Sequence, residues 1–286
     1  MRTYLDCYPC FLRQSIEASR MAGANQAQQY EVVFQVLDLL RAIPSGATPP
    51  EIGLEIHRLV REMTGNPDPY SQVKKEATEK ALRLLPKLRE VLDASDDKLE
   101  TAIRLSIAGN IIDFGLNKNY DLWGEVERVL IQGIAINDIE LLRKKLQEVK
   151  KVLLIGDNAG ETVFDVLLIE SLSVPVTYVT RGGPVLNDAT REDAFAAGID
   201  KIATVMDSGI QAPGTILPFS SIDFREKFIR AELILAKGMG NYETLSEIDA
   251  PIFFLLQVKC PVIGRDIGAP VGSTVVKRGL GFRSET

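Results

Sequence analysis

The second half of the sequence alternates between short apolar runs and segments with helical spacing. Continuous apolar runs are typical of parallel strands buried on both faces, with helices crossing over between them. Such runs occupy residues 150–157, 175–182, 201–209, 231–238 and 251–264, and helical segments follow at 159–172, 189–199, 220–232 and 241–248. This alternation predicts a Rossmann-like three-layer α/β/α fold with a mainly parallel sheet.

The first half contains helical patterns and no strand-like run. Apolar residues recur at helical spacing over 29–43, 49–65, 71–93, 97–115 and 140–151. We therefore expect an all-helical N-terminal section over residues 1–148 and an α/β domain over residues 149–286. The change of character near residue 150 is expected to separate lobes of one unit rather than independent domains.

Composition excludes several classes of protein. The 286 residues carry a formal charge of −6, whereas a general nucleic-acid binder needs a basic face. No apolar run approaches the length of a membrane span, and the N-terminus lacks the apolar core of a signal peptide. Three cysteines are too few for a disulfide framework. We expect a cytoplasmic protein without nucleic-acid or membrane partners; the sequence leaves its oligomeric state open.

The chain has a single histidine, His57, within a helical pattern. A Ser-His-Asp triad or a histidine-rich zinc site would have to use that one residue, and a helix-surface role is the simpler interpretation. Catalysis must therefore use carboxylates, amides, lysines or a hard metal ion.

Polar clusters follow each predicted strand, and ligands of open α/β sheets bind beyond the carboxyl ends of the strands. Asp157 and Asn158 follow the first strand, and Asp188 lies in the next connection. Carboxylate and amide oxygens suit Mg²⁺ or Mn²⁺, with substrate phosphate completing the shell. Lys237 and Lys259, at two later strand ends, could neutralise phosphate oxygens. Each residue taken alone could equally be a helix cap or a solvated strand end, but capping does not explain their convergence.

The motifs GDNAGE, NDAT, KGMGNYETL and the lysine of LLQVKCP, in this order, resemble those of the metal-dependent damage-control phosphatases. LDCYPCFLRQ resembles the branch of that family with an N-terminal Cys-x-x-Cys, and TGNPDPYSQVKKEA and AGNIIDFG also resemble family motifs. The similarity extends from Asp6 to about Arg265. It implies a phosphatase of small phosphorylated metabolites, either sugar phosphates or damaged cofactor intermediates, that uses Mg²⁺, Mn²⁺, Co²⁺ or Ni²⁺.

The resemblance also implies roles for individual residues. Metal ligation falls to Asp157, Asn158 and Asp188. Lys259 matches the family's lysine on the last strand and is expected to act in catalysis, and Asp157 is our own hypothesis for the nucleophile or base, because it ends the first strand at the pocket floor. The substrate and phosphate pocket is implied to contain Lys237, Gly238, Asn241, Tyr242, Asn110 and Asp113. We add Glu161 as a further candidate for this pocket, although it could instead only favour the helix dipole in the first turn. Eukaryotic members carry Arg-Thr-x-Lys at the last strand, where this chain keeps only Lys259, so the substrate is not specified.

Three questions stay open at the level of sequence. Attack on phosphorus could come from Asp157 or from a water on the metal. An S-adenosylmethionine-dependent carboxyl methyltransferase is an alternative, although it calls for a glycine-rich first loop. A non-catalytic sensor of nucleotides or sugar phosphates is another.

Cys7 and Cys10 form a Cys-x-x-Cys motif, and Cys260 lies far away in the sequence. A zinc site normally needs four ligands, and no strand–helix turn of the thioredoxin kind surrounds the pair. We expect a structural role at the start of a helix, with metal binding and redox chemistry as the less favoured alternatives.

Overall fold

The computed structural model describes residues 1–111 and 122–285. In this part of the chain, seven strands form one sheet in the order β1-β7-β6-β5-β2-β3-β4. The strands are β1 (Ile134–Asn137), β2 (Val152–Ile155), β3 (Val176–Thr180), β4 (Thr204–Asp207), β5 (Ile234–Lys237), β6 (Ile252–Gln257) and β7 (Thr274–Arg278). Strands β6, β5, β2, β3 and β4 are parallel, whereas β7 is antiparallel to β6 and parallel to β1.

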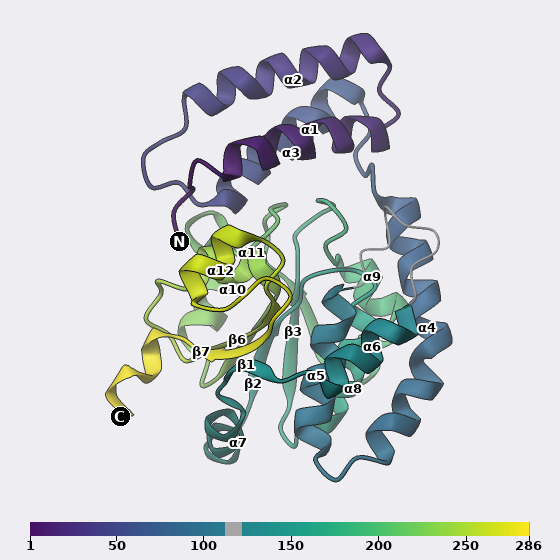
Figure 1. The fold of residues 1–286 in the computed structure, drawn as a ribbon, viewed down its shortest axis with the longest axis vertical. Coiled ribbons are helices and arrows are strands. Elements are labelled where there is room, and N and C mark those ends of the chain that lie inside the picture. Colours follow the sequence, from purple (N-terminus) through teal and green to yellow (C-terminus); the bar gives the residue numbers. More distant parts are fainter. Residues whose placement is uncertain (112–121, 286) are drawn as a thin grey trace.

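Helices cover both faces of the sheet (Figure 1). The helices of the first half are α1 (Cys7–Met21), α2 (Gln26–Arg41), α3 (Pro49–Thr64), α4 (Ser71–Asp93), α5 (Lys98–Ile111), α6 (Leu122–Ile131) and α7 (Ile139–Glu148). Those of the second half are α8 (Thr162–Ser171), α9 (Arg191–Ala196), α10 (Ile222–Ile229), α11 (Gly238–Leu245) and α12 (Pro261–Ile267). The predicted three-layer α/β/α fold with a mainly parallel sheet is confirmed.

Strand β2 shows why its sequence is apolar throughout. Val152 and Leu154 pack into the core formed with α5 and α8, while Leu153 and Ile155 pack into the core formed with α10, α11 and α12. Alternate residues of a strand point to opposite faces, so burial of both faces requires an uninterrupted apolar run. The adjacent β5 repeats the pattern, with Leu235 on one face and Ile234 on the other.

The helical first half contributes to two different parts of the molecule. Helices α4 and α5 contact α8 and belong to the layer on one face of the sheet. Strand β1 and helix α7 precede residue 149, yet β1 pairs with β7 in the sheet. The predicted division at 148/149 therefore separates β1 from its own sheet. The four residues of β1 were too short a pattern to detect, and half of them are exposed.

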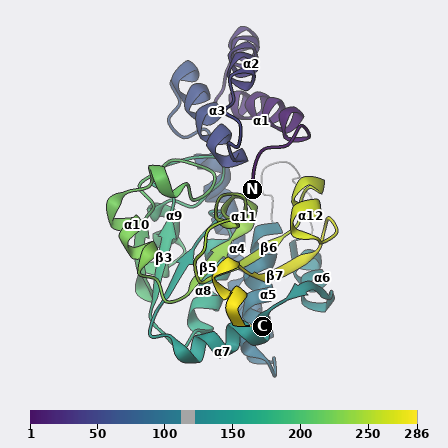
Figure 2. The same cartoon turned by 90° about the vertical axis from the view of Figure 1, so that its left-hand side faces the viewer.

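Helices α1, α2 and α3 form a separate layer, which we call the cap. They share their own apolar core, which includes Phe11, Val32, Val36 and Ile56. Figures 1 and 2 show the cap above α11 and α12, at one end of the molecule. Helix α3 contacts α11, so the cap sits over the loops that carry the predicted site.

The last predicted strand, 251–264, is divided in the structure. Strand β6 ends at Gln257, and α12 begins at Pro261. Proline is favoured at the first position of a helix because its fixed φ suits the helix and its missing N–H is not needed there. The Sγ of Cys260 caps α12 by accepting from the backbone N of Ile263 at 3.5 Å.

Candidate active site

The loops after β2 and β5 meet where the strand order of the sheet reverses. The chain runs from β2 outward through β3 and β4 and then returns to β5 on the other side of β2. Such a point opens the crevice in which α/β proteins bind ligands. Asp157 follows β2, and its carboxylate packs directly against Gly238, which has φ 77° and no room for a Cβ atom. Glycine at position 238 therefore allows the two loops to touch.

The three predicted metal ligands lie together in this crevice. Asn158 and Asp188 form an isolated antiparallel β-bridge. The backbone N of Ala189 donates to the carbonyl of Asp157 at 2.7 Å, which ties the two connections side by side. Leu186, two residues before Asp188, has a left-handed φ of 46°. A non-glycine residue in this region costs about 1–3 kcal/mol, and the turn it forms delivers Asp188 to the site.

Arg181 joins the two carboxylates. Its Nε donates to Asp188 at 2.6 Å, and one terminal nitrogen donates to Asp157 at 3.2 Å. Its other terminal nitrogen donates to the side-chain oxygen of Asn241 at 3.1 Å. Because the Arg181 side chain is 1% exposed, this cation lies within the acidic pair.

Burial raises the pKa of each carboxyl group in the crevice. Desolvation, assisted by the neighbouring Asp188 carboxylate, raises the pKa of Asp157 to about 6, although Arg181 partly offsets the rise. The pKa of Asp188 is also raised by burial, against the opposing effect of Arg181. A carboxyl pair with raised pKa values gains from a nearby cation, because a positive charge stabilises the ionised form.

Lys237 lies beneath the crevice in a closed ionic network. Its Nζ donates to Asp165 at 2.6 Å, to the carbonyl of Ser106 at 3.2 Å and to Glu161. An ammonium group has three donors, and these contacts use all of them. Burial lowers the pKa of Lys237, but Asp165 and Glu161 more than compensate, so the pKa is raised overall. Lys237 is fully buried and is not among the residues that line the cavity above the crevice. It holds Glu161 and Asp165 in place, whereas the sequence predicted a contact with phosphate.

Glu161 connects this network to Asp157. Its second oxygen accepts from Asn110 Nδ2 at 2.8 Å, and the same nitrogen donates to Asp157 at 2.5 Å. Burial raises the pKa of Glu161 to about 7, partly offset by Lys237. Glu161 is fully buried. The predicted substrate residue Glu161 is therefore a support beneath the site, and Asn110 transmits its position to Asp157.

Two further predicted pocket residues, Asn241 and Tyr242, do not line the cavity above the crevice. Asn241 is fully buried and donates to the carbonyls of Gly156 and Lys237, at 3.1 and 2.7 Å, so it ties the ends of β2 and β5 together. Tyr242 donates to Asp266 at 2.9 Å and packs edge-on against Phe254. In a helix, successive side chains point in different directions, so α11 can present Met239, Gly240 and Glu243 to the cavity while Tyr242 points elsewhere. Asp113 lies outside the described residues.

A cavity of about 580 Å³ lies between the cap and this crevice, and we call it the cap cavity. Its size is typical of small-molecule sites. Asn110, Asp157, Asn158, Asp188 and Lys259 all line it. Lys259 is exposed, and its Nζ donates to the carbonyl of Asn110. Of the two predicted phosphate-binding lysines, Lys259 is the one that lines this cavity.

The cap supplies the opposite wall of the cap cavity. The residues that it contributes are Asp6, Cys7, Cys10, Phe11, Arg13, Gln14, Pro49, Pro50 and Gly53. They combine charged, thiol and apolar side chains, so a bound molecule would meet the hard oxygen ligands on one side and the more varied cap on the other.

The donor set fits a hard divalent cation. Asp157 and Asp188 supply carboxylates and Asn158 an amide, which are the oxygen ligands that such a cation prefers. The Arg181 guanidinium already pairs with both carboxylates, so a divalent cation would bind there against the repulsion of this charge. Within residues 1–111 and 122–285, no three His, Cys, Asp or Glu side chains form a metal-holding group. A cation would thus depend on the amide oxygen and on water or phosphate oxygens, which is the coordination that Mg²⁺ and Mn²⁺ commonly adopt.

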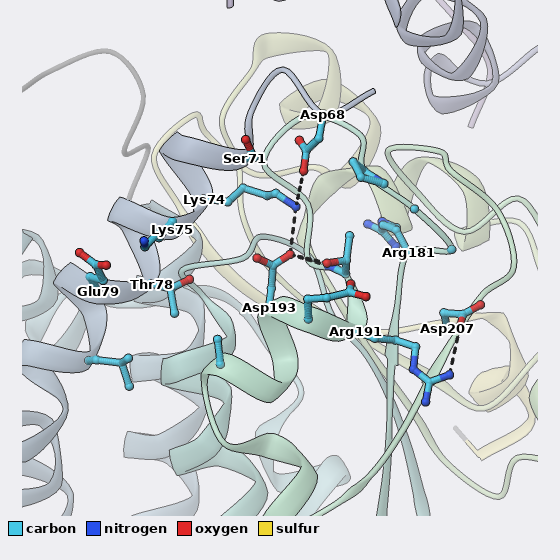
Figure 3. A pocket seen from close by; sticks show the side chains of 17 residues that line it. Asp68, Ser71, Lys74, Lys75, Thr78, Glu79, Arg181, Arg191, Asp193 and Asp207 are labelled. Carbon is cyan, nitrogen blue, oxygen red and sulfur yellow. Dashed lines mark hydrogen bonds and ion pairs between the residues drawn. The ribbon is translucent and has the colours of Figure 1, made fainter. Parts of the chain in front are cut away.

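A second cavity, of about 840 Å³, lies between α4, α9 and the loop after β3 (Figure 3). It is larger, but Asp157, Asn158 and Lys259 do not line it. Lys74 pairs there with Asp68 and Asp193, at 3.5 and 3.1 Å. Lys74 therefore already has two carboxylate partners, and the cavity lacks the Asp157–Asn158 pair, so the cap cavity is better suited to phosphate.

Sequence reasoning missed the roles of Arg181, Asp165 and Glu243. Asp165 interrupts an otherwise apolar helix, and such a residue signals a buried partner. Glu243 lines the cap cavity, and burial raises its pKa to about 8, partly offset by the nearby N-terminal amine. Arg181 has no comparable signal, because an arginine at a strand end is usually solvated.

The chain matches the model of the damage-control phosphatase ARMT1-like domain over residues 3–275. The chain belongs to this family, whose members are phosphatases, and the resemblance found in the sequence is confirmed. The finer assignment to the branch with an N-terminal Cys-x-x-Cys stays a prediction. Within the described residues, none of the helices is both long and apolar enough to cross a membrane.

Two relatives match most of the chain. Damage-control phosphatase PH1575 of Pyrococcus horikoshii is 35% identical over 289 residues, covering 97% of this chain and 98% of the relative. A damage-control phosphatase of Archaeoglobus fulgidus is 41% identical over 235 residues, covering 79% and 81%. The crystal structure of PH1575, described as a DUF89 family protein, superposes with a TM-score of 0.91 at 33% identity and covers 98% of this chain and 99% of that one.

Proposed function

We propose that this chain is a metal-dependent phosphomonoester hydrolase that acts on small phosphorylated metabolites, either sugar phosphates or damaged phosphometabolites, in the cap cavity. The observation that carries the proposal is the convergence of Asp157, Asn158 and Asp188 at the crevice, with Lys259 lining the same cavity. Family membership supports phosphate chemistry over the methyltransferase alternative.

The residues of the crevice and the cap cavity have different proposed roles. Asp157, Asn158 and Asp188 would hold Mg²⁺, Mn²⁺, Co²⁺ or Ni²⁺, which when bound would neutralise phosphate charge. Lys259 balances further negative charge on the phosphate. Asp157, whose side chain is 13% exposed at the cavity floor, serves as nucleophile or as base. Arg181 and Asn110 keep its two oxygens in place.

Phosphate release should require a divalent cation. The purified chain, stripped with a chelator, is expected to release no phosphate from p-nitrophenyl phosphate or a panel of sugar phosphates. Addition of Mn²⁺, Co²⁺, Ni²⁺ or Mg²⁺ should restore turnover. Phosphate release that is unaffected by chelation would refute metal dependence. Thermal protection by sugar phosphates without turnover would favour a binding protein.

Cation binding should stabilise the fold more at pH 8 than at pH 5. The folded-state pKa values of Asp157 and Glu161 are raised from 3.8 and 4.5 to about 6 and about 7. For a raised carboxyl pKa, the unfolded chain ionises first, so stability falls as pH rises through this window. A cation that binds the ionised Asp157 opposes this loss, and fewer protons compete at high pH.

This expectation is checked by thermal unfolding with Mn²⁺ or with chelator at both pH values. Asp157→Asn should remove most of the Mn²⁺-dependent increase in Tm. An equal increase at pH 5 and pH 8 in the unaltered chain would show that the cation binds elsewhere.

A further inference from the structure

All three cysteines of the chain come together at the cap cavity. Cys7 and Cys10 lie in the first turn of α1, Cys260 caps α12, and all three line the cavity that also contains Asp157 and Lys259. An ion pair between Asp6 and Arg265 joins the start of α1 to α12 directly. Two segments about 250 residues apart thus bring thiols to one cavity, and the proposed phosphatase chemistry does not use them.

The environments of Cys7 and Cys10 differ in a way that suits sequential thiol chemistry. Cys10 is partly exposed, and the guanidinium of Arg13 donates to its Sγ at 3.9 Å. Cys10 also lines the cap cavity, so its sulfur can be reached by a small molecule there. Cys7 packs against both the cap core and the core of the α/β layer, and burial raises the pKa of its thiol.

The helix places the two sulfur atoms on neighbouring positions. Residues three apart on a helix are side by side, with Cβ atoms about 5–6 Å apart. Cys7 is the first residue of α1, and no side chain caps the helix there. Closing a disulfide therefore needs only a local adjustment at a helix end, and Cys-x-x-Cys is the spacing that thiol–disulfide exchange proteins use.

We propose that Cys10 and Cys7 form a thiol–disulfide exchange site in the wall of the cap cavity, through which a low-molecular-weight disulfide switches off the phosphatase. The Cys10 thiolate attacks the small disulfide, forms a mixed disulfide and releases one small thiol. Cys7 then loses its proton and attacks the Cys10 sulfur, which releases the second small thiol. Two cysteine thiols are oxidised to one disulfide, and the small disulfide is reduced to two thiols.

The effect on activity rests on the proposed function. The first turn of α1 forms the wall opposite Asp157 and Lys259. A mixed disulfide on Cys10 places its adduct inside the cavity, and the Cys7–Cys10 disulfide draws the wall into a new shape. Both products obstruct a phosphorylated substrate. A resident thiolate metal site is less well supported, because the described residues contain no metal-holding group of three His, Cys, Asp or Glu side chains.

The test counts thiols after treatment with oxidised glutathione. The reduced chain should react with three equivalents of an alkylating agent under denaturing conditions, since it has three cysteines, all free. After oxidation, only Cys260 should be alkylated. Cys7→Ser should stop at the first step and retain one glutathione on Cys10, whereas Cys10→Ser should form neither the adduct at position 10 nor the internal disulfide.

Cys260→Ser is the matched control, and it should still form the Cys7–Cys10 disulfide. Peptide mapping that links Cys260 to Cys7, or three alkylated cysteines after oxidation, would overturn the exchange site. Phosphate release by the unaltered chain should fall on oxidation and return with dithiothreitol. Unchanged release with the disulfide formed would overturn the switch. A chain that releases no phosphate even when reduced contradicts the proposed function instead, and thiol counting still decides the exchange site.

Discussion

Asp157→Asn is expected to lower phosphate release by at least about 10²–10³-fold, the loss seen when one group that stabilises transition-state charge is removed. Asn keeps the shape of Asp157 but removes its negative charge. That charge would hold the cation, and it would let Asp157 either attack phosphorus or activate a water molecule as the nucleophile. The fold should survive, because burial and Asp188 already disfavour the ionised form of Asp157. Steady-state phosphate release and thermal unfolding of the metal-free protein measure the two effects separately.

Asp207→Asn is the matched control for this change. Asp207 also ends a parallel strand, β4, but it lines the second cavity and pairs weakly with Arg191 at 3.7 Å. Its replacement should leave phosphate release close to that of the unaltered chain. If Asp157→Asn retained full activity, the assignment of the crevice as the reaction centre would be wrong.

Lys237→Met is expected to destabilise the folded chain by about 3–5 kcal/mol, the cost of leaving buried charges without their partner. Methionine matches the length of lysine but leaves Glu161 and Asp165 fully buried without a cation. The loss should be smaller at low pH, where Glu161, whose pKa burial raises to about 7, can take up a proton. Urea unfolding at pH 5 and pH 8 gives the free energies.

Lys259→Met separates support from catalysis. Lys259 is exposed, and surface substitutions usually change stability by less than about 0.5 kcal/mol, so this variant should lose activity while its urea midpoint stays unchanged.

Adding Glu161→Gln to Lys237→Met should recover part of the lost stability, since the two residues are in contact. Normal stability of Lys237→Met, combined with lost phosphate release, would return Lys237 to the role that the sequence suggested.

The parts of the fold that follow from local pattern could be predicted. Buried parallel strands such as 152–155 must be apolar throughout, and the polar residues after them stand out. The edge strand β1 could not be recognised, because its four residues form a strand only by pairing with β7, about 140 positions later in the sequence. The division of 251–264 depended on Pro261 as a helix start, a local signal that the apolar run concealed.

The location of the candidate site could be predicted from the sequence, but the roles of several of its residues could not. Asp157, Asn158 and Asp188 could be brought together from strand ends alone. The sequence does not show how deeply a side chain is buried, however. Lys237 and Lys259 both stand at strand ends in the sequence, although Lys237 is fully buried and Lys259 is exposed. Arg181 presents the same problem, since its partners Asp157, Asp188 and Asn241 come from three separate connections.

The separate core of the cap has an evolutionary consequence. Phe11, Val32 and Ile56 stabilise the cap among its own helices, whereas Asp157 and Lys237 are supported by the sheet and by α5 and α8. Mutations on the cavity-facing side of α1 and α3 can therefore accumulate without disturbing the machinery below. Descendants of one ancestor could in this way acquire new substrates while retaining a common reaction, and differences among relatives should concentrate in these two helices.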